Sequence, residues 1–454
     1  DNPVSMINKR NVDGKTIEGT ANVRATLKLA NNLKWVNFLS VDQSDYETLS
    51  YKSRYYPSIL GQYGEAEIEN GKSSSLQYES TINYTKSIEQ HNFQALVGYS
   101  YQTQEANSSY MGNSKFDTDL YGYNNIGAGA AIHSDQAYMS SYKESSTLIS
   151  FFGRLMYNYS ERYLLAVSLR KEGSSRFGEN NKWGWFPAAS LGWRINKENF
   201  MNNVSWVNDL KLRVGYGTTG NQEFANYQSL IMMASAGKFL YNGQWINSYA
   251  PVTNPNPDLR WEKKQEVNAG IDFSILKNRV SGVIDYYYRK STDLLYTYPV
   301  NVPPYIYPSL FANVGSIGNN GLEISINAVA VQKPSLTWST TVTFSKNNNK
   351  LIKFTNADFN SPYIGTGQLY NEFHEQVQRL YEGKPIGTFY GPVWTGVDPT
   401  TGRDTFKNEN DTTHYVDYKN WEPIGNAMPF CILGWSNALT YRDWDLNFSL
   451  RAQI

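Results

Sequence analysis

The stretch SFFGRLMYNYSERYLLAVSLRKEGSSRFGENNKWGWFPAASLGWR, residues 150–194, decides the fold of this chain. Side chains alternate from residue 163 to residue 170: one face of an extended segment would carry Tyr163, Leu165, Val167 and Leu169, and the other Leu164, Ala166, Ser168 and Arg170. A period of two predicts a β-strand. The preceding piece, ending in NYSER, and the following piece, WFPAASLGWR, also read as extended. The stretch therefore predicts three consecutive strands, joined by one very short turn and one polar loop.

The same alternation recurs along the rest of the chain. Residues 16–29 alternate almost without error, and further alternating segments are 33–44, 76–84, 93–101, 210–216, 261–276, 280–297, 322–328, 336–344, 431–440 and 444–450. We expect about fourteen strands, all antiparallel and each ~10 residues or longer, which exceeds the usual strand length in soluble sheets.

Short turns alternate with long polar segments. The turns LKNR (276–279) and YRD (441–443) are short, whereas the alternation stops over about 104–145, 221–259 and 356–423, which predicts long loops. One strand face is apolar, and the other carries charged and amide side chains that a dry core could not hold unpaired. Lipid on one side and water on the other explain both faces, so the pattern predicts an all-β antiparallel transmembrane β-barrel. The alternative is a long-stranded soluble β-protein such as a propeller or a solenoid.

The composition narrows the class of protein further. The 454 residues include 41 basic and 41 acidic side chains, so no excess of positive charge points to a nucleic-acid partner. Aromatic residues make up 15% of the chain, which suits an interface between apolar and polar media. Cys431 is the single cysteine and excludes an intrachain disulfide or a multi-cysteine metal site. No run of 18 apolar residues is present, so we expect no transmembrane helix.

Residues 150–194 closely resemble the SusC/RagA family of TonB-dependent outer-membrane transporters, in which a strand ending in GSSRFG is followed by an FP…GWR strand. Other blocks resemble the family in the same order: LKLRVGYGTTGNQEFANY (210–227), NPDLRWEKKQEVNAGIDFSIL (256–276), RVSGVIDYYYRKSTDLL (279–295), NVGSIGNNGLEISI (313–326), EGKPIGTFYGPVWTGVDPTTGRD (382–404) and IGNAMPFCILGWSNALTYRDWDLNFSL (424–450). The resemblance covers nearly the whole chain beyond about residue 13.

The resemblance implies a 22-stranded barrel with an N-terminal plug and a TonB box before the plug. We expect residues 1–454 to form part of one such transmembrane domain with long extracellular loops. The plug and the TonB box are not in this sequence, and the final strands of the barrel are missing. An incomplete barrel would leave two unpaired edges, which cannot persist in lipid, so we interpret the chain as a fragment.

The function implied by the resemblance is import of glycans or peptides across the bacterial outer membrane, without cofactors and without enzymatic chemistry. The implied partners are TonB, a SusD-like surface lipoprotein and the lipid membrane, and pairs of transporter and lipoprotein could form a dimer. The alternative hypothesis is an outer-membrane barrel that anchors an adhesin or a loop-borne enzyme, although no catalytic grouping stands out in the loops.

Two short motifs favour structural explanations. Gly215, Gly217 and Gly220 spell G-x-G-x-x-G, but a Tyr/Asn/Gln-rich segment follows in place of the helix that a dinucleotide site needs. His374 opens HEQVQ, which lacks the second histidine of a zinc-protease motif, and we expect no metal site. The surrounding NEFHEQVQRLYEG (371–383) could hold one short helix.

Two groups of residues are candidate site residues. The family signature, to which we assign a structural role, comprises Arg170, Gly173, Ser174, Ser175, Arg176, Phe177, Gly192, Trp193 and Arg194. Within it, the charges around GSSRF could instead bind an anionic ligand, but a strand–loop junction is the favoured interpretation. Aromatic candidates for stacking on sugars or contacting peptides are Tyr121, Tyr123, Tyr241, Trp245, Tyr305, Tyr363 and Tyr370, which could equally form interfacial girdles.

Overall fold

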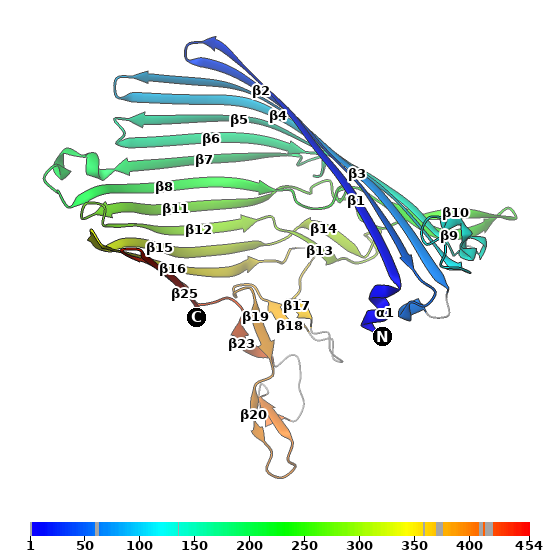
Figure 1. Ribbon diagram of the computed structural model, residues 1–454. Coiled ribbons are helices and arrows are strands. Elements are labelled where there is room, and N and C mark those ends of the chain that lie inside the picture. Colours follow the sequence, from blue (N-terminus) through cyan, green and yellow to red (C-terminus); the bar gives the residue numbers. More distant parts are fainter. Residues whose placement is uncertain are drawn as a thin grey trace.

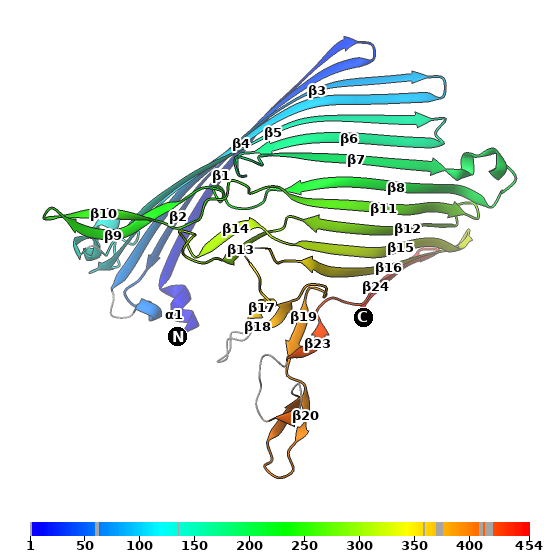
Figure 2. The same cartoon turned by 180° about the vertical axis from the view of Figure 1, so that it is seen from behind.

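The computed structural model describes residues 2–59, 63–134, 136–356, 359–368, 376–407, 412–413 and 421–454. Its centre is one sheet of 14 strands, which confirms the strand number expected from the sequence and curves into an open wall (Figures 1 and 2). Neighbouring strands are antiparallel. The sheet comprises β1 (Arg10–Ala30), β2 (Leu33–Lys52), β3 (Gly64–Ile88), β4 (His91–Phe116), β5 (Tyr138–Tyr159), β6 (Tyr163–Ser174), β7 (Trp183–Arg194), β8 (Val207–Asn221), β11 (Glu262–Ile275), β12 (Val280–Thr292), β15 (Ser316–Lys333), β16 (Leu336–Lys353), β24 (Ile432–Tyr441) and β25 (Trp444–Gln453).

The connections differ between the two ends of the wall (Figure 1). At the turn end, most strands join through short segments such as 31–32, 89–90 and 160–162, and the connection 195–206 between β7 and β8 is the longer exception. At the loop end, the connections include 117–137, 222–261, 293–315 and 354–431. The expected alternation of short turns and long loops is therefore confirmed, and the first and last strands, β1 and β25, form the two edges of the sheet.

Smaller elements lie outside the main sheet. The helical ones are α1 (Pro3–Asn8), η1 (Pro57–Ile59), η2 (Ile126–Ala128), η3 (Ala130–Ser134), η4 (Ile195–Lys197) and η5 (Asn199–Met201). The loop strands are β9 (Met233–Tyr241), β10 (Gln244–Pro251), β13 (Leu295–Pro299), β14 (Ser309–Asn313), β17 (Ile364–Gln368), β18 (Gln376–Leu380), β19 (Thr388–Gly391), β20 (Trp394–Val397), β21 (Asp404–Lys407), β22 (Thr412–Thr413) and β23 (Glu422–Asn426). In the described part of the chain, no helix is long and apolar enough to cross a membrane.

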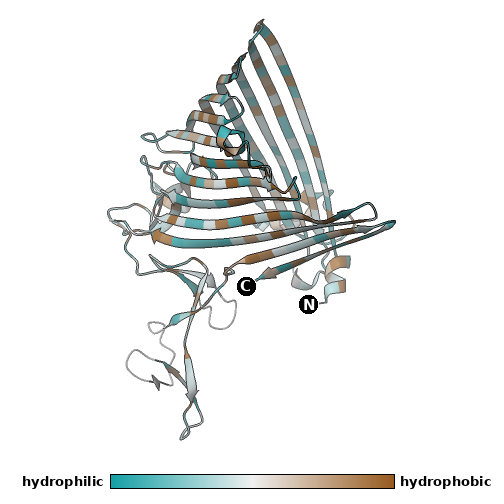
Figure 3. Ribbon diagram, turned by 90° about the vertical axis from the view of Figure 1, so that its left-hand side faces the viewer, coloured by the Kyte–Doolittle hydropathy of each residue, from teal (hydrophilic) through white to brown (hydrophobic). Residues whose placement is uncertain are grey.

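The main sheet has two chemically different faces, because paired residues on adjacent strands share a face. Gly270 pairs with both Arg213 and Asp285, so these two charged residues lie on one side, which we call the water face. The residues between them in sequence, such as Leu212 and Val214, lie on the opposite side, the lipid face. Polar and apolar residues alternate along the strands in Figure 3 for this reason.

Aromatic residues mark the borders of the apolar band on the lipid face. On β7, Trp185 and Trp193 bracket Pro187, Ala189 and Leu191. The two tryptophans are eight residues apart, and ~3.3 Å per residue gives a separation of ~26 Å. This distance matches the ~25 Å apolar band between the aromatic girdles of outer-membrane barrels. The wall is therefore long enough to span a membrane, and the long loops lie beyond one border.

Two expectations about the loops were wrong. Residues 104–116 and 138–145 belong to β4 and β5, not to a loop, and the register continues from Gln104 paired with Ser146 to Gly112 paired with Tyr138. Beyond the apolar band both faces meet water, so the hydrogen-bonded ladder persists without apolar alternation. The suggestion that 371–383 could hold one short helix is also wrong for its described part: Gln376–Leu380 forms β18, which pairs with β17, while 371–375 lie outside the described residues.

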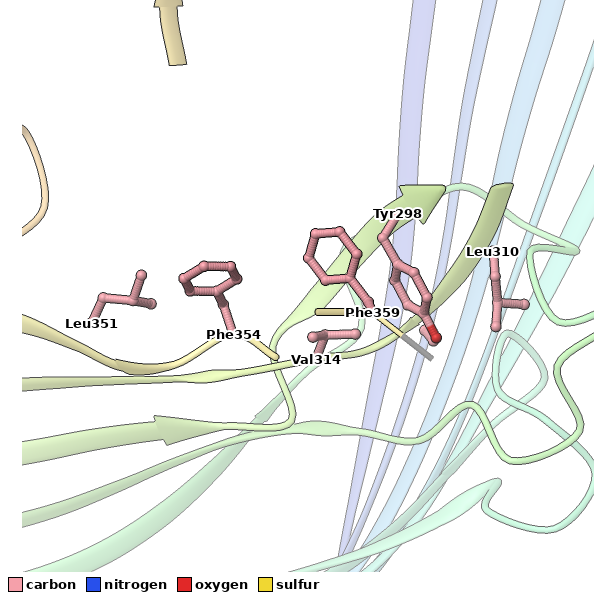
Figure 4. Packing of buried hydrophobic residues seen from close by; sticks show 7 residues of the cluster. Tyr298, Leu310, Val314, Leu351, Phe354 and Phe359 are labelled. Carbon is pink, nitrogen blue, oxygen red and sulfur yellow. The ribbon is translucent and has the colours of Figure 1, made fainter. Parts of the chain in front are cut away.

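Buried apolar clusters hold the loops together at the loop end. One cluster comprises Tyr298, Leu310, Ala312, Val314, Leu351, Phe354 and Phe359 (Figure 4). The rings of Tyr298 and Phe359 are 5.1 Å apart, so the β13–β14 hairpin packs against the segment that follows β16. A second cluster contains Phe177, Phe186, Leu259 and Trp261. These clusters give the loop end a folded scaffold on which polar side chains can be positioned.

Candidate functional site

The water face carries a compact ionic network across three strands. Arg213 on β8 donates from Nε and Nη2 to the two carboxylate oxygens of Asp272 on β11, at 2.9 and 2.8 Å. The same Nη2 lies 3.1 Å from Oδ1 of Asp285 on β12. Gly270 lies between them, and a Cβ there would stand 2.2 Å from Oδ1 of Asp285. A residue without a side chain is what allows the guanidinium to reach both carboxylates.

Arg170, the first residue of the family signature, belongs to a second polar group on the water face. Its Nη2 donates to Glu172 Oε1 and to Ser150 Oγ, each at 2.7 Å. Ser150 Oγ in turn donates to Glu172 at 2.8 Å. Arg170 is therefore already paired with a carboxylate, while Lys171, the next residue, lies on the opposite face.

Arg176 forms the centre of the loop-end junction. Its Nε donates to Asn226 Oδ1 at 2.8 Å, and its Nη1 donates to the carbonyl of Gln222 at 2.9 Å. Phe177 is only 1% exposed, and its ring lies 4.5 Å from that of Trp261. The GSSRF segment thus connects β6 to the loop that follows β8 and to the start of β11.

The serines and the glycine of the signature complete this junction. Ser175 Oγ accepts from the backbone N–H of Thr147 at 2.9 Å, and Ser174 Oγ accepts from that of Arg176 at 3.2 Å. At Gly173, a Cβ would lie 2.7 Å from the Trp183 ring, so glycine permits the close approach of β7.

The remaining signature residues lie at the other end of the wall. Gly192, Trp193 and Arg194 end β7 near the turns, and Trp193 Nε1 donates to Glu198 Oε1 at 2.9 Å. Arg194 Nη1 is 3.9 Å from a carboxylate oxygen of Glu161. The signature residues lie close together in the sequence, but the structure divides them between the two borders of the membrane band.

Two hollows meet at Arg176 and share Ser146 and Thr147. One, of about 370 Å³, is also lined by Gln102, Gln104, Leu148, Gly220, Asn221, Gln222 and Glu223. The other, of about 840 Å³, includes Asn226, Tyr227, Ser229, Pro255 and Pro257 in its lining. We call this region the mouth. Amide and hydroxyl groups dominate the smaller hollow, and such groups can hydrogen-bond to sugar hydroxyls or to peptide amides.

The structure does not gather the aromatic candidates into one pocket. Tyr241 and Trp245 belong to the β9–β10 hairpin and are 64% and 68% exposed, and Tyr121 is exposed on the 117–137 loop. Tyr123 donates a hydrogen bond to Asp13, and Tyr305 packs against the Tyr298 cluster.

The last two aromatic candidates belong to the segment that precedes β18. The Tyr363 ring is 5.4 Å from Tyr381 and faces the Arg379 guanidinium at 4.7 Å. Tyr370 lies outside the described residues.

Of the residues that line the mouth, sequence reasoning selected only Ser175, Arg176 and Phe177, as parts of the family signature. Gln102, Gln104 and Tyr227 were not among the candidates, although the two glutamines occupy water-face positions of β4. The sequence did contain a clue to them. Gln102 and Gln104 are two residues apart, so they continue the polar face of the strand beyond its last apolar residues. The strands and loops that surround these glutamines are set by the pairing register of the sheet. One segment of sequence does not contain that information.

These features define a class of protein. A sheet with one face for lipid and one for water, aromatic borders ~25 Å apart and long loops at one end forms the wall of an outer-membrane β-barrel. The chain belongs to the family described as TonB dependent receptor-like, beta-barrel, which matches residues 5–451, and its place is the bacterial outer membrane. The resemblance to SusC/RagA-type transporters is confirmed.

Individual relatives support this assignment. TonB-dependent receptor P3 of Formosa agariphila is 29% identical over 470 residues, covering 100% of this chain and 46% of the relative. TonB-dependent receptor SusC of Bacteroides thetaiotaomicron is 32% identical over 391 residues, covering 84% of this chain and 37% of SusC. The chain thus spans less than half the length of these relatives.

A solved structure shows the same fold. The RagAB peptide transporter matches with a TM-score of 0.83 and 24% identity, over 98% of this chain and 48% of that chain.

Proposed function

We propose that the full-length protein is a TonB-dependent importer of glycans or peptides that works with a SusD-like surface lipoprotein. The observation that carries the proposal is the mouth: hydrogen-bonding side chains from β4, β5 and two loops meet at the loop end of a membrane wall. The similarity to TonB-dependent receptor SusC supports TonB-dependent transport. Amide and hydroxyl side chains make up most of the lining of the smaller hollow, which favours hydrogen-bonding ligands such as sugars and peptides.

We also propose that the chain is part of a larger barrel. In the described sheet, β1 pairs only with β2 and β25 pairs only with β24, so each edge has backbone groups without a strand partner. Unpaired backbone groups are costly in lipid. Further strands of the full-length protein would pair with both edges, and the greater length of the relatives leaves room for these strands and for a plug.

Growth on defined nutrients tests the proposal. In the source bacterium, the genes for the full-length protein, for TonB and for the neighbouring SusD-like lipoprotein are deleted one at a time. We expect each deletion to slow growth on the same glycan or peptide and to leave growth on a monosaccharide unchanged. Normal growth of all three strains on every candidate would contradict TonB-driven import and would favour an anchoring role.

A further inference from the structure

A set of lysines borders the apolar band on the lipid face. On three strands the first lipid-face residue beyond the apolar run, toward the loop end, is a lysine: Lys171 follows Leu169, Lys290 follows Tyr288, and Lys346 follows Phe344. Two further lysines on the same face lie farther along β11 and β16. We call the set Lys171, Lys263, Lys290, Lys346 and Lys350 the lysine row.

The strand register places the lysine row on the lipid face. Lys171 pairs with Trp185, whose own lipid-face position was established above. Lys290 pairs with Gln265 and with Gly318, and Gly318 pairs with Lys350. Lys290 and Lys350 are therefore two strands apart in one row, at a backbone separation of ~10 Å.

No carboxylate balances these charges. The lipid face of the described strands β6, β7, β8, β11, β12, β15, β16 and β24 carries neither Asp nor Glu, and within the described residues none of the five lysines forms an ion pair. The water face behaves differently, since Arg170, Arg213 and Arg289 are each paired with a carboxylate. On these eight strands the lipid face is thus left with uncompensated positive charge at one border.

Aromatic rings hold two of these ammonium groups in place. Lys171 Nζ lies 5.3 Å from the ring centre of Trp183 and 5.1 Å from that of Trp185. Lys346 Nζ lies 3.8 Å from the ring centre of Phe430. The rings attract the cations, and the long lysine stems can follow the apolar surface while the charge stays at headgroup level.

We propose that the lysine row binds phosphate-bearing lipids of the leaflet at the loop end. Such a lipid is complementary to this surface in two ways. Its headgroup supplies negative charge at the lysine row, and its acyl chains cover the apolar band directly below. A free phosphate would satisfy only the first requirement. The site faces away from the mouth and does not depend on which nutrient is imported.

Lipid retention by the full-length protein tests this proposal. The purified protein is placed in nanodiscs of phosphatidylcholine with a minority of bis-phosphorylated lipid A, and retained lipid A is counted by native mass spectrometry. We expect the triple variant K171Q/K290Q/K346Q to bind lipid A less tightly by roughly fivefold for each lysine removed. Lys264→Gln is the matched control, because it removes the same charge from β11 on the water face and should retain lipid A normally.

Three results would overturn the proposal. They are unchanged retention in the triple variant, an equal loss in Lys264→Gln, and complete displacement of lipid A by inorganic phosphate. The single variant Lys290→Gln covers the case in which the triple variant fails to fold, because no ring contact of Lys290 is present in the described structure. A fivefold loss in this variant supports the lipid site, and unchanged binding contradicts it.

Discussion

At the scale of single residues, Arg213 joins three strands of the wall through charge. Its guanidinium is 30% exposed and contacts both Asp272 and Asp285. Removing it would leave Asp285 and Asp272 without their shared partner, and among the described residues only Lys211 Nζ, 3.9 Å from Asp272, would remain close by. We expect Arg213→Ala to lower the free energy of unfolding by about 1–2 kcal/mol, because charged hydrogen bonds are lost and water screens only part of the remaining repulsion.

Thermal unfolding of the full-length protein in detergent measures this effect. Arg154→Ala is the control, since Arg154 also lies on the water face but forms no ion pair within the described residues. Equal stability of the two variants would show that the network contributes nothing beyond a single charge.

Gly270 provides a steric test of the same network. A Cβ at this position would lie 2.2 Å from Asp285 Oδ1 and 2.8 Å from Arg213 Nη2, so Gly270→Ala should force the ion pairs apart. At Gly215, on the same face, the nearest atom to a new Cβ is 3.9 Å away. We expect a lower melting temperature for Gly270→Ala and no loss for Gly215→Ala. Two unchanged melting temperatures would mean that the wall adapts without cost.

At the scale of elements, the GSSRF segment fixes the loop that follows β8. Arg176 hydrogen-bonds both Asn226 and Gln222, and Phe224 between them packs against Phe177, so Arg176→Ala should loosen residues 222–226 without detaching them. Hydrogen–deuterium exchange of the peptide 222–226 should become faster, because its backbone amides lose the protection that the anchored loop gives them. Glu179→Ala, an exposed change in the same β6–β7 loop, should leave the exchange unchanged. Identical exchange in both variants would contradict the role of Arg176 as a clamp.

Glu382 gives the segment after β16 a pH dependence. The backbone N–H of Phe354 holds the pKa of the Glu382 carboxyl below its usual value, and Thr355 adds two more hydrogen bonds. A lowered pKa in the folded state means that the contact is complete above the ordinary glutamate pKa of ~4.3 and is lost as the pH falls through the lowered value.

Exchange of a peptide covering residues 351–356, corrected for the intrinsic pH effect, tests this assignment. We expect constant protection from pH 8 to 6 and a loss below about pH 4. Glu382→Gln should show weaker protection that does not change near pH 4, because its amide oxygen can accept the same hydrogen bonds but carries no charge and does not titrate. A pH dependence that persists in this variant would assign the effect to another group.

Elements were predictable to different degrees. The strands around 150–194 follow from residues such as Tyr163 and Leu165, because lipid selects apolar side chains at every second position. The upper part of β4, up to Phe116, was not predictable, since water on both faces removes that selection. The strand at Gln376–Leu380 was mistaken for a helix because its pairing with β17 is a tertiary property that short-range periodicity does not record.

At the scale of the whole molecule, the two faces of the sheet account for the composition. A chain with balanced charge and many aromatics forms a wall that meets lipid on one side and water on the other. The sequence pattern predicted this arrangement. It did not predict the mouth, because Gln104, Arg176 and Gln222 come from separate segments that meet only through the register and the GSSRF junction.

Uptake into intact cells tests the central claim most directly. Cells that produce the full-length protein receive fluorescently labelled glycans and peptides, with and without TonB, and periplasmic accumulation is measured. We predict that at least one ligand accumulates above the level in gene-deleted cells and that this accumulation falls to background without TonB. Equal accumulation with and without TonB, or no accumulation of any ligand above the gene-deleted cells, would contradict it.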